Sequence, residues 1–349
     1  MNKENHTYII GEIGQNHNGS VDIAKLIMDI VARPVEDQLF GENLAPIDAV
    51  KLTKRDLKEE LTNSAMNKVY NSPHSFGKTY GEHREYLELN DEEHFELYKY
   101  AKSYGLDFVE TLTAKGTLSL LKLFTPDKLK VASRDLTNIP LLESMAETKI
   151  PIILSTGMGG KKEIDDALNS ITKYHSDIAI LHCLSEYPAK YQNLNLKSIQ
   201  FLLENYPEYA IGYSDHSIGI SVPVAAVAMG ARIIEKHITI DRKLKGTDQA
   251  GSLGVDGTWR MVRDIRNIEH ALGEKRIFVA DSVESARVKL ERSIASIRDL
   301  NEGEILSEKD FHMLSPGDGF KWSDRDKLIG KTLVNSISKN EIIYPNDVK

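Results

Sequence analysis

Eight short apolar segments alternate with amphipathic stretches along most of this chain. Stretches of helical periodicity separate them, for example at 92–105, 161–174 and 198–206. Continuous apolar strands that alternate with helices predict a parallel sheet covered on both faces. Eight repeats of this unit predict a (β/α)₈ TIM barrel, in which functional residues lie at the carboxyl ends of the strands. The eight segments are residues 8–14, 48–54, 107–113, 128–135, 151–158, 178–185, 209–216 and 231–240.

An open, doubly wound α/β sheet is the alternative arrangement of the same elements. Such a sheet binds its ligand in one crevice, so only a few of its strands need polar ends. Here every apolar segment finishes in polar side chains. This uniform pattern favours a closed ring of strands.

Two regions fall outside the repeat. Residues 55–90 form a long polar insertion after the second strand, and a loop of this length is typically a lid or a binding loop. Near the C-terminus, short strands and two similar turns, LNEGEIL and SKNEIIY, indicate a small β-rich domain. We therefore expect a barrel at 1–280, a linker at 281–291 and the small domain at 292–349.

Composition excludes several classes of protein. The chain has 349 residues, 41% of them hydrophobic, and a formal net charge of −8, which provides no basic surface for nucleic acid. Its start lacks a signal peptide, and no apolar run is long enough to span a membrane. The single cysteine, Cys183, excludes an intramolecular disulfide and suits a reducing compartment. We therefore expect a cytoplasmic protein.

The polar side chains at the strand ends predict a site for an anionic ligand. Two lysines and several hydroxyl groups suit a phosphate ester, although any one of them could be an ordinary solvated loop residue. In a barrel, all of these side chains converge on one mouth. They are Glu12, Lys51, Thr53, Thr111, Lys130, Ser133, Asp135, Ser155, Ser185, Tyr187, Ser214, Asp215, His216 and His237.

His216 and His237 close two successive strand segments, so they are expected side by side. Two histidines completed by carboxylates and water suit Mn²⁺, Mg²⁺ or Co²⁺ better than a closed zinc site. The alternative is that each ring separately binds a backbone carbonyl. No dinucleotide GxGxxG, complete P-loop, GxSxG or HExxH motif occurs, and the sixth strand lacks the lysine that one class of Schiff-base aldolases uses.

Several motifs taken together resemble the N-acetylneuraminate (sialic acid) synthase family. They are EIGQNHNGS, LSTGM, LHCLSEYPA, GYSDHSIGI, EKHITIDRKLKGTDQAGSL and the tail that contains SPGDGF. The resemblance runs from end to end and includes the antifreeze-like (SAF) domain of the family. The insertion SPHSFGKTYGEHREYLEL is similar to the version found in sialic acid 9-phosphate synthases.

The resemblance implies a reaction and a set of roles. The family condenses phosphoenolpyruvate with open-chain N-acetylmannosamine, or its 6-phosphate, to give a nonulosonic acid and phosphate. His216 and His237 would hold the divalent metal, foremost Mn²⁺, and Glu12 or Asp215 would carry a proton. The antifreeze-like domain implies a domain-swapped homodimer. Phosphoenolpyruvate would contact Lys51, Thr111, Lys130, Ser133, Ser155, Ser185 and Ser214, while the sugar or a metal-bound water would contact Glu12, Asp135, Tyr187 and Asp248.

Departures from the family pattern leave the sugar open. Thr53 stands where the family usually has glutamine in its substrate site, and ASRD replaces GSGE or GSGD, which adds Arg134. Ser315 stands where many bacterial members have arginine, and Gln249 where phosphate-type members have histidine. A legionaminic, pseudaminic or deaminated product therefore stays open beside sialic acid. A sugar 6-phosphate would need a basic partner, for which the candidates are Arg134, Lys54 and Arg55.

Two other functions remain as alternatives. A Schiff-base aldolase or lyase could act through Lys51 or Lys130, and borohydride would then trap its intermediate. A catalytically silent glycan-binding protein could use the antifreeze-like domain, but it would have no need for the charged strand ends.

Overall fold

The computed structural model describes residues 6–37 and 41–349, which form two compact units, 1–273 and 274–349. In the first unit, eight parallel strands close into a barrel, because β10 pairs with β1 in register from Ile233 opposite Tyr8 to His237 opposite Glu12. The TIM-barrel prediction is confirmed, and the open sheet is excluded. The barrel strands are β1 (Tyr8–Gly14), β4 (Ala49–Lys54), β5 (Asp107–Leu112), β6 (Lys128–Val131), β7 (Ile152–Ser155), β8 (Ile178–Cys183), β9 (Ala210–Asp215) and β10 (Ile233–His237).

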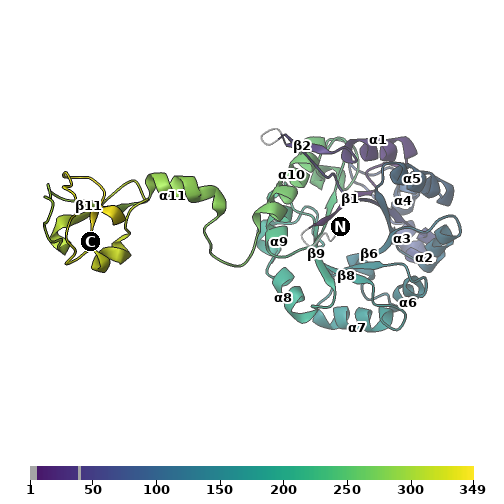
Figure 1. Cartoon of the computed structure of the whole chain (residues 1–349). Helices are drawn as coiled ribbons and strands as arrows, with labels where there is room; N and C mark the ends of the chain where they lie inside the picture. The colour runs from purple at the N-terminus through teal and green to yellow at the C-terminus, as the bar shows by residue number, and fades with distance from the viewer. Residues whose placement is uncertain (1–5, 38–40) are drawn as a thin grey trace. The chain divides into compact units, whose positions relative to one another are not determined.

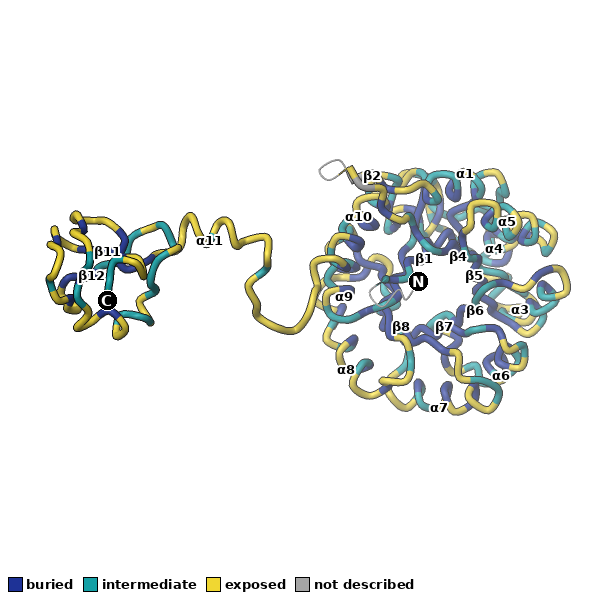
Figure 2. The backbone as a smooth tube through the Cα atoms, in the orientation of Figure 1, coloured by how far each residue is buried: buried dark blue, intermediate teal, exposed yellow. Residues whose placement is uncertain are grey.

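Helices surround this ring of strands (Figure 1). Their inner faces and the outward side chains of the strands form the main apolar core, while the outer faces of the helices are exposed (Figure 2). The helices are α1 (Val21–Val31), α5 (Asp91–Ser103), α6 (Ile139–Glu147), α7 (Lys161–Ile171), α8 (Ser198–Asn205), α9 (Ser221–Ala228) and α10 (Val255–Ala271). A 3₁₀ helix, η1 (Lys115–Lys122), takes the place of an α-helix between β5 and β6.

A second, smaller apolar cluster fills the amino-terminal half of the barrel interior. Its members come from six strands and are Ile10, Ala49, Val109, Ile153, Ala179, Leu181 and Ile233. Because strand side chains alternate between the two faces, the interior positions two residues further along lie nearer the carboxyl ends. Those positions are Glu12, Lys51, Thr111, Ser155, Cys183 and Glu235. The barrel therefore has an apolar floor and a polar mouth.

The insertion after β4 is folded. It contains α2 (Leu57–Glu60), α3 (Asn63–Met66) and α4 (Tyr80–Leu87). The ring of Phe76 stacks on that of Tyr86, with centroids 4.6 Å apart, and on that of His83, at 5.9 Å. A short hairpin of β2 (Val35–Asp37) and β3 (Glu42–Leu44), which the sequence did not lead us to expect, precedes β4.

The second unit pairs β11 (Ser293–Ser296) with β12 (Phe311–Leu314) and has a small apolar core of its own, which includes Ile294 and Leu328. Within the expected linker lies a helix, α11 (Glu284–Leu290). This helix belongs to the second unit, since the backbone N–H of Gly317 donates to the carbonyl of Val288 at 2.8 Å. Short 3₁₀ helices complete the unit at Asp281–Val283, Glu308–Asp310, Trp322–Lys327 and Pro345–Asp347.

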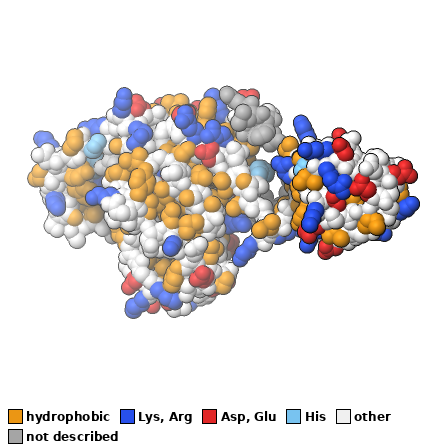
Figure 3. All heavy atoms as spheres, turned by 90° about the vertical axis from the view of Figure 1, so that its left-hand side faces the viewer, with side chains coloured by type: hydrophobic (Ala, Val, Ile, Leu, Met, Phe, Trp, Pro, Cys, Tyr) orange, Lys and Arg blue, Asp and Glu red, His pale blue; other side chains and the backbone are white. Residues whose placement is uncertain are grey.

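Two surface properties bear on function. In the described part of the chain, no helix has the length and hydropathy needed to cross a membrane. On the face shown in Figure 3, basic and acidic side chains are interspersed and form no large basic patch.

Candidate active site

A cavity of about 470 Å³ opens at the carboxyl ends of the barrel strands. All of the predicted site residues line it except Asp135 and Asp215. Those it brings together are Glu12, Lys51, Thr53, Thr111, Lys130, Ser133, Ser155, Ser185, Tyr187, Ser214, His216, His237 and Asp248.

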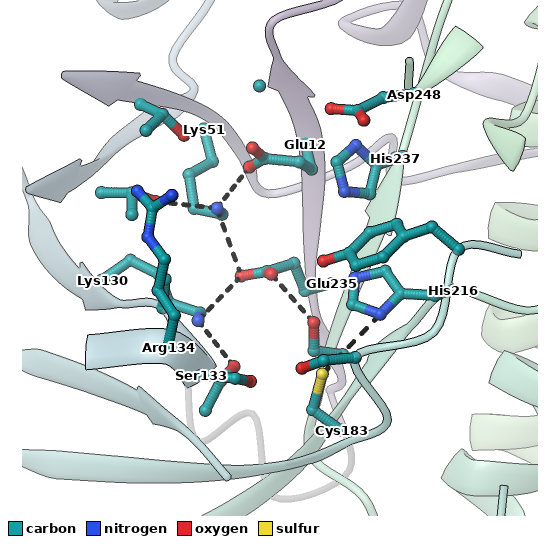
Figure 4. Close-up of a pocket in the computed structure, with 18 of the residues that line it drawn as sticks. Glu12, Lys51, Lys130, Ser133, Arg134, Cys183, His216, Glu235, His237 and Asp248 are labelled. Carbon is teal, nitrogen blue, oxygen red and sulfur yellow. Dashed lines mark hydrogen bonds and ion pairs between the residues drawn. The ribbon is translucent and has the colours of Figure 1, made fainter. Parts of the chain in front are cut away.

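Two buried lysines and two buried glutamates occupy the base of the cavity. Lys51 Nζ lies 2.5 Å from a carboxylate oxygen of Glu12 and donates to Thr111 Oγ1 at 2.9 Å. Lys130 Nζ donates to Ser155 Oγ at 2.6 Å. The carboxylate of Glu235 lies between the two ammonium groups, 3.8 Å from Lys51 Nζ and 3.9 Å from Lys130 Nζ (Figure 4).

Glu235 is the most important residue that our sequence analysis missed. It is 6% exposed and accepts a hydrogen bond from Ser214 Oγ at 3.0 Å, while its Oε2 atom receives none. Its position did carry a signal, because it precedes His237 by two residues on one strand and therefore shares its face. The cavity also includes Gln15, Arg84, Met158 and Thr247, which come from loops and the insertion, and Cys183 from the end of β8.

The two glutamates differ in their affinity for protons. Burial raises the pKa of Glu12 to about 7, even though the neighbouring charge of Lys51 opposes this change. Burial would raise the pKa of Glu235 too, but the charges of Lys130 and Lys51 outweigh it and lower that pKa. Glu12 is therefore the carboxylate that can gain or lose a proton near neutral pH, as a general acid or base must.

His216 and His237 lie on the far side of Glu235 from the lysines (Figure 4), with ring centroids 5.6 Å apart. His216 Nδ1 donates to the carbonyl of Leu184 at 2.7 Å, which fixes the ring and leaves Nε2 free to bind a ligand. His237 Nδ1 is buried and has no hydrogen-bond partner. Two neighbouring imidazole rings of this kind suit a divalent cation.

The described residues contain no group of three or more His, Cys, Asp or Glu side chains that could hold a metal. A cation bound by His216 and His237 would therefore take its remaining ligands from water and substrate. This is the open arrangement of a catalytic metal rather than the closed arrangement of a structural zinc.

Asp215 does not line this cavity but a smaller pocket beside it, together with His216, His237 and Asp248. The preceding residue, Ser214, lines the main cavity, and the side chain of Asp215 lies on the other face of the strand. There its carboxylate lies 2.5 Å from Lys236 Nζ and accepts hydrogen bonds from Tyr213 and Ser217. Both side chains of the ion pair are fully buried. With its oxygens occupied in this way, Asp215 is a poor candidate for a proton carrier.

Asp135 does not line the cavity either, for a local reason. Ser133, Arg134 and Asp135 form a 3₁₀ turn after β6, and this turn points successive side chains in different directions. Ser133 and Arg134 line the cavity, whereas Asp135 does not and lies 3.3 Å from Arg134 Nε. Asp135 therefore supports Arg134 from outside the cavity.

The Asp215–Lys236 ion pair joins the two residues that precede the histidines in the chain, and Asp215 lines a small pocket with both histidines. We predict that Lys236→Met lowers the free energy of unfolding of the barrel by about 3–5 kcal/mol, since it leaves a buried carboxylate unpaired. It should also weaken Mn²⁺ binding about tenfold or more, because the histidines lose their support. Thermal unfolding and Mn²⁺ titration of metal-stripped protein measure the two effects.

The double variant Asp215→Asn/Lys236→Met is the control for this prediction. It removes both charges and should recover most of the stability, because no buried charge is left unpaired. Unchanged Mn²⁺ affinity in a folded Lys236→Met protein would contradict the supporting role of the ion pair.

Comparisons with known proteins agree with this geometry. The NeuB family model matches residues 43–277, and the SAF domain model matches residues 291–349. The N,N'-diacetyllegionaminic acid synthase of Legionella pneumophila is 34% identical over 95% of this chain and 91% of its own length. The N-acetylneuraminate-9-phosphate synthase of Drosophila melanogaster is 32% identical over 98% of this chain and 95% of its own length. A solved N-acetylneuraminic acid synthetase from Leptospira borgpetersenii is 31% identical, with a TM-score of 0.67 over 80% of this chain and 90% of that one.

Proposed function

Because the chain belongs to the NeuB family, we propose that it is a nonulosonic acid synthase. The proposed reaction joins phosphoenolpyruvate to an open-chain N-acetylmannosamine-type sugar, or its 6-phosphate, and releases phosphate. Relatives named for sialic, legionaminic and pseudaminic acids match nearly the whole chain, so the family alone does not choose the sugar. The observation that supports the reaction best is the juxtaposition of two buried lysines and two histidines in one cavity.

The lysine side of the cavity suits phosphoenolpyruvate. This molecule carries roughly three negative charges near neutral pH, on a phosphate and a carboxylate. Lys51 and Lys130 supply two buried positive charges. Hydroxyl groups around the two lysines supply further donors for the anionic oxygens. These hydroxyls belong to Thr111, Ser133, Ser155, Ser185 and Ser214.

The histidine side of the cavity suits the sugar. His216 and His237 would hold the divalent metal, and Mn²⁺ is the first choice. A metal bound there would polarise the sugar aldehyde as a Lewis acid. The ring of Tyr187 lies 3.9 Å from that of His216, centroid to centroid, and can pack against the sugar chain. Asp248 lies beside His237 (Figure 4) and can accept hydrogen bonds from sugar hydroxyls.

The proposed reaction has two stages, formation of the carbon–carbon bond and release of phosphate. C3 of phosphoenolpyruvate attacks the aldehyde carbon, and the aldehyde oxygen gains a proton. Water then adds to C2 and loses a proton, and the tetrahedral intermediate expels phosphate to leave the 2-keto acid. Glu12 is our candidate for the group that moves a proton, because it lines the cavity and its pKa is raised to about 7.

A phosphate-release assay tests this proposal. Metal-stripped protein is mixed with phosphoenolpyruvate and Mn²⁺, and N-acetylmannosamine, its 6-phosphate and the hexose precursors of the related acids are compared. We expect release that needs both the metal and one of these sugars. Absence of sugar-dependent release with every one of them would contradict the proposal.

One observation favours a second chemistry. Burial lowers the pKa of Lys130, and a Schiff-base lysine needs a lowered pKa to act as a nucleophile. In that case borohydride would trap a keto-acid adduct on the protein, and a chelator would leave the activity intact.

The homodimer, the cytoplasmic location and the native metal expected from the sequence stay predictions.

A further inference from the structure

Three arginines gather on one side of the cavity. Arg55 follows β4, Arg84 comes from α4 in the insertion, and Arg134 lies in the turn after β6. Arg55 and Arg134 share the carboxylate of Glu60, and the pKa of Arg55 is lowered, first by burial and then by the charges of Arg134 and Arg84. Guanidinium groups repel one another, so anions that lie close to such a cluster stabilise it.

Carboxylates of the protein pair with Arg55 and Arg134 but not with Arg84. Glu60 lies 2.6 Å from Arg55 Nη1 and 3.1 Å from Arg134 Nη1. Arg84 has no carboxylate within 4.0 Å among the described residues, and its partners there are the hydroxyl of Tyr80 and the amide oxygen of Gln15. Arg84 therefore lines the cavity without a carboxylate partner of its own.

Arg55 adds an independent sign of a missing ligand. Its side chain is only 9% exposed, yet its Nε atom has no hydrogen-bond partner. The nearest carboxylate oxygen, from Glu88, lies 3.5 Å away and does not accept a hydrogen bond from it. A buried donor without an acceptor is costly, and an incoming anion would satisfy it.

We propose that Arg84 and Arg55 bind the phosphate of a phosphorylated acceptor sugar, so that the proposed synthase acts on a hexosamine 6-phosphate rather than on the free sugar. This inference rests on the proposed function and names its acceptor class. Arginine forks match phosphate oxygens in geometry as well as in charge.

The position of Arg84 agrees with this role. Its guanidinium is hydrogen-bonded to Gln15, which follows β1, and β1 pairs with β10, the strand that ends in His237. Arg84 therefore belongs to the same side of the barrel as a proposed metal ligand. In an open-chain hexose 6-phosphate, the aldehyde and the phosphate are at opposite ends. With the aldehyde at the histidines, the phosphate end can extend to the arginines at the rim.

The phosphate of phosphoenolpyruvate is the other possible source of the anion. The two buried lysines and the hydroxyls around them already suit that phosphate, so the arginines are left for a second one. Arg134 differs from Arg84 here, because it lies on the lysine side of Glu235 in Figure 4 and has two carboxylate partners. Arg84 is therefore the residue to change.

The experiment measures kcat/KM for N-acetylmannosamine 6-phosphate and for N-acetylmannosamine, and KM for phosphoenolpyruvate. It compares the wild type with Arg84→Gln, Arg84→Lys and Arg260→Gln. The last variant is the matched control, since Arg260 is an exposed arginine of the same unit, on α10. We expect the wild type to prefer the 6-phosphate. Arg84→Gln should reduce this preference about 10- to 100-fold, through KM for the sugar phosphate. Arg84→Lys should reduce the preference for the 6-phosphate less than Arg84→Gln does, and Arg260→Gln should leave the preference unchanged.

Three results would overturn the proposal. They are a wild-type preference for the free sugar, an equal loss with both sugars in Arg84→Gln, and a raised KM for phosphoenolpyruvate in that variant. Calorimetric titration of metal-stripped protein with N-acetylmannosamine 6-phosphate separates this question from the proposed function. If no sugar drives phosphate release but the sugar phosphate still binds more weakly to Arg84→Gln, the phosphate site stands and the synthase reaction falls.

Discussion

Lys130→Met is expected to lower kcat/KM for phosphoenolpyruvate about 100- to 1,000-fold, mainly by raising its KM. Lys130 is 2% exposed, and two of its three N–H groups bind Ser155 Oγ and the carbonyl of Val131. The third is free for the anionic substrate. Removal of one partner from a buried, hydrogen-bonded charge pair typically costs about 2–5 kcal/mol of binding. Steady-state kinetics and direct titration with phosphoenolpyruvate measure the loss.

Two further variants make this prediction sharp. Lys130→Met also leaves Glu235 without one of its two cations, which can destabilise the fold. Lys130→Met/Glu235→Gln removes both charges and should unfold at a temperature closer to that of the wild type, yet remain unable to bind phosphoenolpyruvate tightly. Lys128→Met is the matched control, because Lys128 lies on the same strand but pairs with Asp107, away from the cavity. Wild-type affinity for phosphoenolpyruvate in a folded Lys130→Met protein would contradict our assignment.

Strand periodicity explains both the success and the main error of the sequence analysis. The apolar segments were long enough to predict all eight barrel strands, and their carboxyl ends had to meet at one mouth. Along each strand, however, only every second side chain faces the interior. Strict alternation back from His216 and His237 would have placed Ser214 and Glu235 inside the barrel and Asp215 and Lys236 outside. Our sequence analysis included the polar residues at each strand end without separating the two faces of the strand. It therefore included Asp215 in the site and missed Glu235.

Other features depend on tertiary structure that no local pattern reveals. Arg84 lies 30 residues beyond the end of the preceding strand, β4, and reaches the cavity only because the insertion folds back against the loop that follows β1. Likewise, the free thiol of Cys183 and the orphan nitrogen of His237 become visible only when neighbouring strands are in register. Sequence therefore predicted the fold and most of the base of the site, whereas the rim that selects the sugar required the structure.

His216→Asn and His237→Ala are expected to weaken Mn²⁺ binding about 100-fold or more and to abolish sugar-dependent phosphate release, because each removes one of two protein ligands. Asparagine at position 216 keeps a donor near the place of Nδ1, so the hydrogen bond to Leu184 can survive while Nε2 is lost. A defect in His216→Asn is therefore assigned to ligation and not to a disordered loop. Electron paramagnetic resonance of free Mn²⁺, titrated into metal-stripped protein, measures the affinity without any turnover.

His182→Asn is the matched control for the two histidine variants. His182 is also on a barrel strand and 9% exposed, but it binds the carbonyl of Leu194 and does not line the cavity. It should retain the Mn²⁺ affinity of the wild type even if its stability falls. If His182→Asn and His237→Ala lose Mn²⁺ equally, the loss reflects general damage to the barrel. If a folded His237→Ala protein binds Mn²⁺ and releases phosphate like the wild type, the metal site lies elsewhere. The unpartnered nitrogen of His237 would then have another role, such as a hydrogen bond to the sugar.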